Sequence, residues 1–315
     1  MTQAASPFYA AITLGSNSFN MLVAQTVAGH PSIVAKYKQK VRLAEGITDA
    51  GALSTEVMRR GLDCLTLFAQ KIAEHQILLD NVAVYATATL RQINNADEFH
   101  KLALPILGKP IEVISGLKEA ELIYQGMAAT TEGDAKRLVI DIGGASTEFI
   151  VGDAEQLLFK TSLPMGCVLF NREVFAKGPY TLAHFSQAKT LVSAAISDDY
   201  DDIAHAGWQQ VLGASGVVQS VISVLKYRQQ AERITLDVLL QLRDEIIALP
   251  STDLTLLSGL DAEKAPTFAS GIAILLALFE LLKIDHLILA GGALREGVLY
   301  QLAANIHSTT DDEPA

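Results

Sequence analysis

The feature that most constrains this chain is an internal repeat of a short strand–turn segment. Residues 12–18 read ITLGSNS and residues 140–146 read IDIGGAS, so Thr13 corresponds to Asp141, 128 positions later. In both copies an apolar run leads into a turn of small residues. A domain-sized spacing indicates duplication of one folding unit, because solenoid repeats recur every roughly 20–50 residues. We therefore expect two similar domains that face each other across a cleft.

The predicted elements follow the same order in both halves. Three strand-like runs open the chain at residues 8–14, 19–27 and 32–41. Helical periodicity and buried-strand runs then alternate, and the second half repeats this order from residue 138. The predicted fold class is α/β, with two duplicated ribonuclease-H-like domains. Their predicted bounds are 1–124 and 125–306, followed by a polar tail at 307–315.

Composition indicates a folded protein and excludes several classes of partner. Half of the 315 residues are hydrophobic, which favours a large core. With 24 Lys and Arg against 35 Asp and Glu, the net charge of −11 argues against a broad surface for nucleic acid or anionic lipid. The two cysteines, Cys64 and Cys167, are too few and too far apart for a disulfide scaffold or a zinc site.

We expect a cytoplasmic protein that does not bind membranes. Residues 1–7 lack the basic and apolar regions of a signal peptide. The most apolar window, residues 267–279, is shorter than the about 20 residues that a membrane span needs.

Both repeated turns have the composition of an anion-binding loop. Small residues leave backbone amides and hydroxyl groups accessible to phosphate oxygens, which bulky side chains would block. One such turn could equally be an ordinary hairpin turn, whereas two related turns can hold successive phosphates. The candidate phosphate-binding residues are Gly15, Ser16, Asn17 and Ser18 in the first turn and Gly143, Gly144, Ala145, Ser146 and Thr147 in the second.

Six segments resemble, in order, the exopolyphosphatase / guanosine pentaphosphate phosphatase (Ppx/GppA) family of the actin-like ATPase superfamily. They are residues 14–19, 88–91, 114–120, 139–148, 164–167 and 293–297. The resemblance implies a hydrolase that removes the terminal phosphate of inorganic polyphosphate, with guanosine pentaphosphate as the alternative substrate. A non-catalytic binder of polyphosphate or nucleotide and an ATP-dependent kinase of the same superfamily are further alternatives.

The resemblance also assigns the two residues closest to the chemistry. Glu119 stands where the family has its catalytic base, which would accept a proton from the water that attacks the terminal phosphorus. An acid in the first turn of a helix also favours the helix dipole, so its position alone does not prove catalysis. Arg91 matches an arginine that binds substrate phosphate. Its alternative role is a helix cap or a surface ion pair.

Asp141 and Glu148 bracket the second turn, and the family's corresponding acids hold magnesium. Paired carboxylates beside phosphate suit a hard divalent cation. Gly213 and Ser215 belong to a strand-to-helix turn that resembles a third phosphate-proximal loop of the family. We expect Mg²⁺ as the cofactor, with K⁺ as a candidate second cation and a homodimer as a candidate assembly.

Three positions depart from the family pattern. Thr13 replaces an acid before the first turn, which removes one potential cation contact. Lys118 replaces the acid before Glu119 and would add positive charge beside the base. Ala145 replaces a glycine and would restrict the backbone if that position required a positive φ.

Lys36, Lys38, Lys40 and Arg42 recur at every second residue, as on one face of a strand. Such a ladder is typical of a solvated edge that discourages strand pairing, or it could bind a polyanion.

Overall fold

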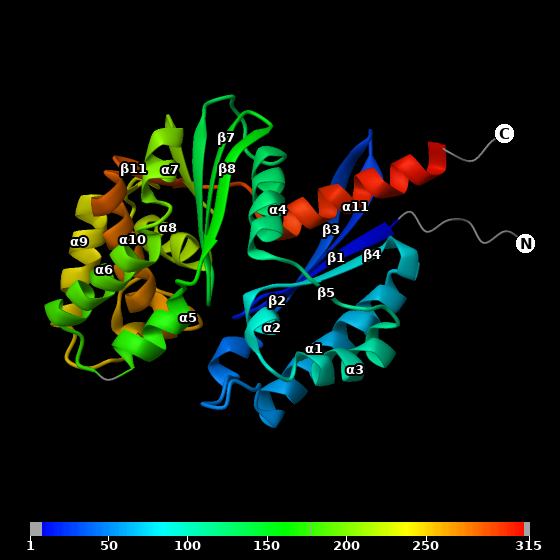
Figure 1. Ribbon diagram of the computed structural model, residues 1–315, viewed down its shortest axis with the longest axis horizontal. Helices are drawn as coiled ribbons and strands as arrows, with labels where there is room; N and C mark the ends of the chain where they lie inside the picture. Colours follow the sequence, from blue (N-terminus) through cyan, green and yellow to red (C-terminus); the bar gives the residue numbers. More distant parts are fainter. Residues whose placement is uncertain (1–7, 177, 312–315) are drawn as a thin grey trace, which may run out of the picture. The chain divides into compact units, whose positions relative to one another are not determined.

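The computed structural model describes residues 8–176 and 178–311, and the chain forms two compact units (Figure 1). Unit 1 contains residues Met1–Thr131 and Gly292–Ala315, and unit 2 contains Glu132–Gly291. The chain therefore leaves unit 1 once and returns to it. Each unit has its own mixed β-sheet and its own core.

Unit 1 is built on a five-stranded sheet with the order β3-β2-β1-β4-β5. Its strands are β1 (Phe8–Leu14), β2 (Phe19–Val27), β3 (His30–Gln39), β4 (Val82–Ala86) and β5 (Glu112–Val113). The first three strands form an antiparallel meander, and β4 and β5 continue the sheet parallel to β1. Lys36 and Lys38 of the predicted ladder lie on β3, which is an edge strand. The strand ends at Gln39, and the backbone of Arg42 is left-handed, so Lys40 and Arg42 do not continue the ladder as predicted.

Helices cover both faces of this sheet. They are α1 (Thr55–Glu74), α2 (Ala88–Gln92), α3 (Ala96–Leu107), α4 (Gly116–Ala128) and α11 (Leu294–Asp311). Because successive strand residues point to opposite faces, Ile12 packs in the cluster with α1 and α3, whereas Ala11 packs in the cluster with α4 and α11. The unit therefore has a core layer on each face of the sheet.

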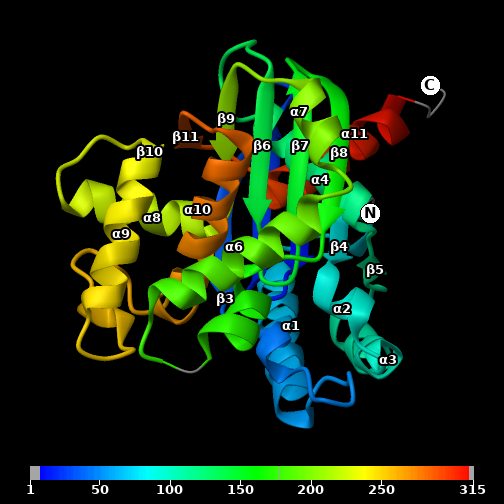
Figure 2. The ribbon, with the colours of Figure 1, turned by 60° about the vertical axis from the view of Figure 1, so that its left-hand side comes forward.

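Unit 2 has a six-stranded sheet with the order β10-β11-β9-β6-β7-β8 (Figure 2). Its strands are β6 (Arg137–Ile142), β7 (Thr147–Asp153), β8 (Gln156–Leu163), β9 (Gln210–Gly213), β10 (Ile234–Thr235) and β11 (His286–Leu289). Its helices are α5 (Cys167–Phe170), α6 (Leu182–Ile196), α7 (Tyr200–Ala206), α8 (Gly216–Tyr227), α9 (Leu236–Ala248) and α10 (Phe268–Leu282).

The duplication inferred from the sequence is visible in the strand pairing. β6, β7 and β8 form an antiparallel meander, and β9 and β11 extend it in parallel, as β4 and β5 do in unit 1. Thr13 pairs with Asn20 across the first hairpin, and Asp141 pairs with Glu148 across the second. The spacing of 128 residues therefore holds on both arms of the hairpin.

The most apolar helix lies in the core of unit 2. The segment Ala265–Leu282 has a mean hydropathy of 1.9 and is long enough, by length and composition alone, to cross a membrane. It is 78% buried, and all residues from Phe268 to Phe279 are buried. Packing within the core accounts for its composition.

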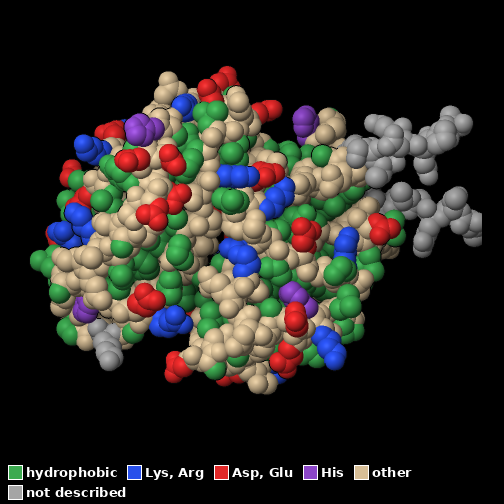
Figure 3. Space-filling model, in the orientation of Figure 1, with side chains coloured by type: hydrophobic (Ala, Val, Ile, Leu, Met, Phe, Trp, Pro, Cys, Tyr) green, Lys and Arg blue, Asp and Glu red, His purple; other side chains and the backbone are tan. Residues whose placement is uncertain are grey.

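Figure 3 shows that acidic and basic side chains are interspersed on one surface of the molecule.

The structure corrects the predicted domain bounds. The prediction placed the last helix in a C-terminal domain at 125–306, whereas α11 packs in unit 1, where Val298 and Leu299 share a core cluster with Leu122 of α4. The physical reason is long-range packing that no local pattern reveals. Helix α11 also extends to Asp311, into the predicted tail, and residues 312–315 lie outside the described residues.

Candidate active site

The first turn presents backbone amides in a fixed orientation. The Gly15 amide donates to the Ser18 carbonyl at 3.1 Å, which closes the hairpin. The carbonyls of Ser16 and Asn17 accept from the amides of Ala44 (3.0 Å) and Arg42 (2.8 Å). In a trans peptide the N–H points opposite to the C=O, so these bonds direct the amides of Asn17 and Ser18 to the other side of the turn.

Within residues 8–176, no hydrogen bond takes the amides of Ser16, Asn17 or Ser18 as donors. Backbone donors that converge in this way form an anion-binding concavity. Phosphate binding by residues 15–18 stays a prediction, with which these unbonded amides are compatible.

The second turn repeats this geometry with a different support. The Gly143 amide donates to the Ser146 carbonyl at 2.8 Å, and the Gly143 and Gly144 carbonyls accept from the amides of Cys167 and Val168, both at 2.9 Å. The amides of Gly144, Ala145 and Ser146 donate to no hydrogen bond within the described residues. Ala145 does not have a positive φ, so its methyl group causes no backbone strain there.

Sequence reasoning missed how closely Gly166 supports this turn. A Cβ atom at Gly166 would collide with the Gly144 carbonyl and the Ala145 amide, so only glycine permits the contact. The buried Thr147 hydroxyl donates to the Met165 carbonyl at 2.5 Å. Thr147, predicted to bind phosphate, is therefore a residue that supports the turn from inside unit 2.

Two acids lie side by side at the base of the second turn. Asp141 and Glu148 are directly opposite in the β6–β7 pair, so their side chains share one face of the sheet. Glu148 is 2% exposed, and its Oε1 accepts a hydrogen bond from the Ser162 hydroxyl of β8 at 2.8 Å. The second hairpin therefore carries a buried, hydroxyl-bonded carboxylate beside a second carboxylate.

The corresponding row in unit 1 has no acid. Thr13 pairs with Asn20, and Asn20 pairs with Lys38 of β3. The duplicated hairpins have thus diverged in charge: the second suits a cation and the first suits an anion. Extending the sequence repeat by two residues, from Ser18 to Asn20, would have revealed this difference.

The acid pair fits magnesium held together with a substrate. Among the described residues, no group of three or more His, Cys, Asp or Glu side chains could hold a metal ion. Mg²⁺ does not need such a cage, because it keeps several waters and binds one or two carboxylates together with phosphate oxygens. Asp141 and Glu148 would supply those carboxylates.

The predicted base and the predicted phosphate-binding arginine form an ion pair. Ser115 caps α4 by accepting from the Lys118 amide at 3.1 Å, which places Glu119 in the first turn of the helix. Arg91 Nη1 donates to Glu119 Oε2 at 3.1 Å and to the Ile114 carbonyl at 2.7 Å. The side chains are 23% and 9% exposed, so Arg91 is neither a helix cap nor a solvated surface residue.

The ammonium group of Lys118 pairs with the neighbouring acid of the helix, Glu121. Its Nζ lies 2.8 Å from Glu121 Oε1, three residues along the same helix. The guanidinium of Arg91 contacts Glu119. The long lysine side chain reaches the neighbouring turn of the helix because residues three apart share a face.

The third predicted loop has mainly local roles. A Cβ at Gly213 would lie 2.6 Å from Val218 Cγ2, so the position needs glycine for packing. The Ser215 hydroxyl caps α8 by accepting from the Val218 amide at 3.4 Å. What this loop offers to an anion is the N-terminus of α8.

Outside these loops, burial raises the pKa of Cys64 to about 12, which keeps its thiol protonated and unreactive.

Two duplicated α/β units, each with a small-residue turn at the tip of its first hairpin, define a protein with the two-domain actin-like fold. The Ppx/GppA phosphatase family model matches residues 22–306. The chain belongs to the Ppx/GppA phosphatase family.

Curated relatives of this chain are named guanosine-5'-triphosphate,3'-diphosphate pyrophosphatases. The one from Aeromonas salmonicida is 45% identical over 302 residues, covering 96% of this chain and 60% of the relative. The one from Vibrio cholerae is 43% identical over 307 residues, covering 97% and 61%. The chain thus spans about three fifths of the length of these relatives.

Solved structures confirm the predicted fold class. An exopolyphosphatase from Cytophaga hutchinsonii matches with a TM-score of 0.84 at 24% identity, covering 95% of this chain and 98% of that chain. A Ppx/GppA family member from Aquifex aeolicus matches with a TM-score of 0.77 at 22% identity, covering 98% and 99%.

Proposed function

We propose that this chain hydrolyses the terminal phosphoanhydride of the 5'-triphosphate of guanosine pentaphosphate and releases inorganic phosphate. The observation that carries the reaction class is the buried Glu119 carboxylate, held by Arg91 at the start of α4. The substrate is supported by the names of relatives at 43–45% identity. The structures named exopolyphosphatases lie below 25% identity and support the fold alone, so the relatives favour guanosine pentaphosphate over the polyphosphate expected first.

In the proposed reaction, a water oxygen attacks the γ-phosphorus in line and the bond from that phosphorus to the β,γ-bridging oxygen breaks. Glu119 orients the water and accepts its proton, while the bridging oxygen leaves on the β-phosphate. Arg91 holds the Glu119 carboxylate through one N–H, and a guanidinium has five such donors in total. Its remaining donors are suited to phosphate oxygens, as the sequence resemblance implied.

The two turns would bind phosphate oxygens through the amides of residues 16–18 and 144–146. Asp141 and Glu148 would hold magnesium, which would neutralise the charge that develops on the phosphates. That both turns serve one substrate in a shared cleft stays a prediction.

One argument for a non-catalytic binder is weakened by the geometry. It relied on Lys118 beside Glu119, but the ammonium group of Lys118 is paired with Glu121. The other argument was the missing acid at Thr13. Thr13 lies in the first hairpin, β1–β2, which pairs with β3 and its residue Lys38, so this hairpin suits an anion.

The test measures phosphate release from guanosine pentaphosphate by the wild type, Glu119→Gln and Glu121→Gln, with magnesium and after chelation. We expect Glu119→Gln to lower kcat by about 10²–10⁴-fold with binding retained, because it removes only the proton acceptor. Glu121→Gln, on the same helix, should keep its activity. Chelation should abolish release and added Mg²⁺ should restore it.

Long-chain polyphosphate is assayed in parallel. A higher kcat/KM on polyphosphate would replace the proposed substrate but keep the reaction class. Full activity of Glu119→Gln on both substrates would refute the role of the base.

A further inference from the structure

The segment between β3 and α1 holds the first phosphate turn in place. Arg42 has a left-handed backbone (φ 53°, ψ 50°), which is uncommon for a residue other than glycine. This bend turns the chain so that the amides of Arg42 and Ala44 reach the carbonyls of Asn17 and Ser16. The orientation of the turn amides therefore depends on the position of residues 42–44.

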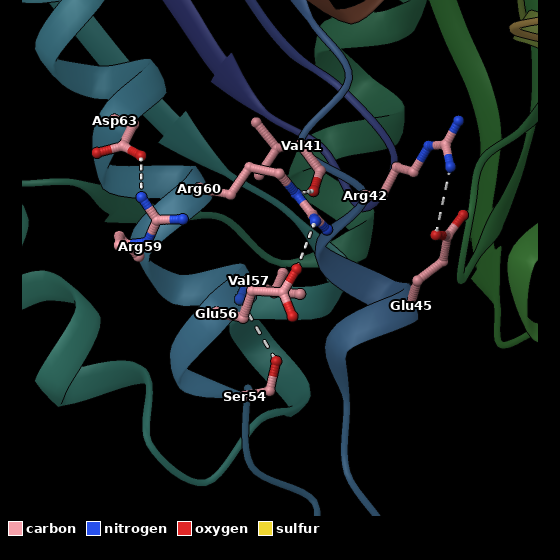
Figure 4. Close-up of polar contacts among 9 residues, drawn as sticks. All are labelled: Val41, Arg42, Glu45, Ser54, Glu56, Val57, Arg59, Arg60 and Asp63. Carbon is pink, nitrogen blue, oxygen red and sulfur yellow. Dashed lines mark hydrogen bonds and ion pairs between the residues drawn. The ribbon is translucent and has the colours of Figure 1, made fainter.

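Helix α1 and its N-cap contact this segment at two places. Arg60 Nε donates to the carbonyl of Val41, the residue before the bend, at 2.7 Å (Figure 4). The amide of Ser54, the N-cap of α1, donates to the Gly46 carbonyl at 2.9 Å. Gly46 also packs so closely on Val57 that a Cβ atom would collide with that side chain. The helix and the turn are thus connected through a short, rigid segment.

Arg60 differs from its neighbour Arg59 in this respect. The Arg59 side chain is 73% exposed and pairs with Asp63 of the same helix, at 3.3 Å (Figure 4). Arg60 is 38% exposed and lies 3.8 Å from Glu56, but its strong contact is the Val41 carbonyl. A charge-assisted hydrogen bond to a buried carbonyl restricts the backbone, whereas an exposed ion pair on one helix does not.

We propose that Arg60 is a positioning residue for phosphate binding. Its hydrogen bond to the Val41 carbonyl fixes the bend at Arg42. The amides of Arg42 and Ala44 then hold the carbonyls of Asn17 and Ser16, which leaves the amides of Asn17 and Ser18 directed at the phosphate. The inference rests on the proposed function because it takes this turn to bind substrate phosphate. The second turn, in unit 2, is supported differently: Gly166 packs against its backbone, and amides at the start of α5 donate to its carbonyls.

The experiment compares full-length Arg60→Ala and Arg60→Lys with the control Arg59→Ala. We expect Arg60→Ala to raise KM for guanosine pentaphosphate and Kd for inorganic phosphate about tenfold, because one charge-assisted hydrogen bond is lost. Arg60→Lys should recover part of this loss, since an ammonium group can still donate to the carbonyl. Arg59→Ala should stay within about twofold of the wild type.

Amide NMR of the ligand-free protein gives a readout that does not need activity. In Arg60→Ala the chemical shifts of residues 16–18 and 41–44 should change, and in Arg59→Ala they should not. If the wild type does not hydrolyse guanosine pentaphosphate, the proposed function fails, while these shifts and the Kd for phosphate still test Arg60.

Unchanged shifts and Kd in Arg60→Ala would overturn the proposal, as would a lower Tm with no other effect. If Arg60→Ala does not fold, Arg60→Lys decides by the same measurements.

Discussion

At the residue scale, the environment of Glu119 distinguishes it from the other acids of α4. Its carboxylate is buried and bonded to Arg91, whereas Glu121 has a side chain 33% exposed and pairs with Lys118. An ion pair that is shielded from water is costly to break, because the remaining charge loses its partner without gaining solvent. In the proposed reaction the same contact would orient the carboxylate for chemistry. Arg91 would therefore have a structural and a functional role at once.

Replacing Arg91 separates these two roles. We expect Arg91→Ala to lower the free energy of unfolding by about 2 kcal/mol, as a partly buried carboxylate is left unpaired. Turnover should fall by on the order of 10²-fold, and Arg91→Lys should restore stability better than turnover, because an ammonium group lacks the planar fork of donors. Urea unfolding and phosphate-release kinetics measure the two effects. Wild-type turnover in Arg91→Ala would contradict the functional role.

At the element scale, two hairpins of the same design have acquired different supports. In unit 1 the turn carbonyls bind amides that follow the edge strand β3, and in unit 2 they bind amides at the start of α5. In both, small residues at the tip allow the supporting backbone to approach. The conformation of each turn thus depends on an element outside its hairpin.

Gly166 offers a direct test of this dependence. We expect Gly166→Ala to destabilise the protein by about 1–3 kcal/mol or more, because its Cβ meets backbone that cannot move aside, and to abolish phosphate release. At Gly216, by contrast, the nearest atom to an added Cβ is Lys264 Nζ at 3.6 Å, so Gly216→Ala should leave Tm unchanged. Thermal unfolding of both variants provides the comparison. Equal Tm values would show that the close approach is not required.

At the scale of the whole molecule, the chain duplicates its sheet but not its connections. After unit 2 it returns to unit 1, where α11 packs on α4 and on β1. Gly126 of α4 and Gly297 of α11 allow this packing, since a Cβ on either would collide with backbone of the other helix. Unit 1 therefore needs residues from both ends of the chain to complete its core.

The packing of α11 on α4 predicts that Gly297→Ala destabilises unit 1 in particular. The added methyl group would push α11 off α4 and expose the cluster around Leu122 and Val298. Hydrogen exchange should show lost protection in β1, α4 and α11, with unit 2 protected as before. Ala304→Ser, at an exposed position of α11, is the control. Unchanged protection in Gly297→Ala would refute the role of this contact.

Much of this arrangement follows from local sequence. The strands Phe8–Leu14 and Phe19–Val27 have the predicted bounds, because alternation and turn residues act over a few positions. The repeat at Thr13 and Asp141 predicted the duplicated fold. That the small residues of both turns bind an anion stays a prediction. The short helix α2, which carries Arg91, was missed, since five residues are too few for helical periodicity.

Tertiary structure alone decided the partners of these residues. Arg91 contacts Glu119 across 28 positions, and Arg60 contacts Val41 across 19. Helix α11 joined unit 1 although the chain had passed through all of unit 2 before it. Local propensities describe which backbone form a segment prefers, but they carry no information about which distant surface buries it. The physical reason is that burial and hydrogen bonding are satisfied only when the whole chain has packed.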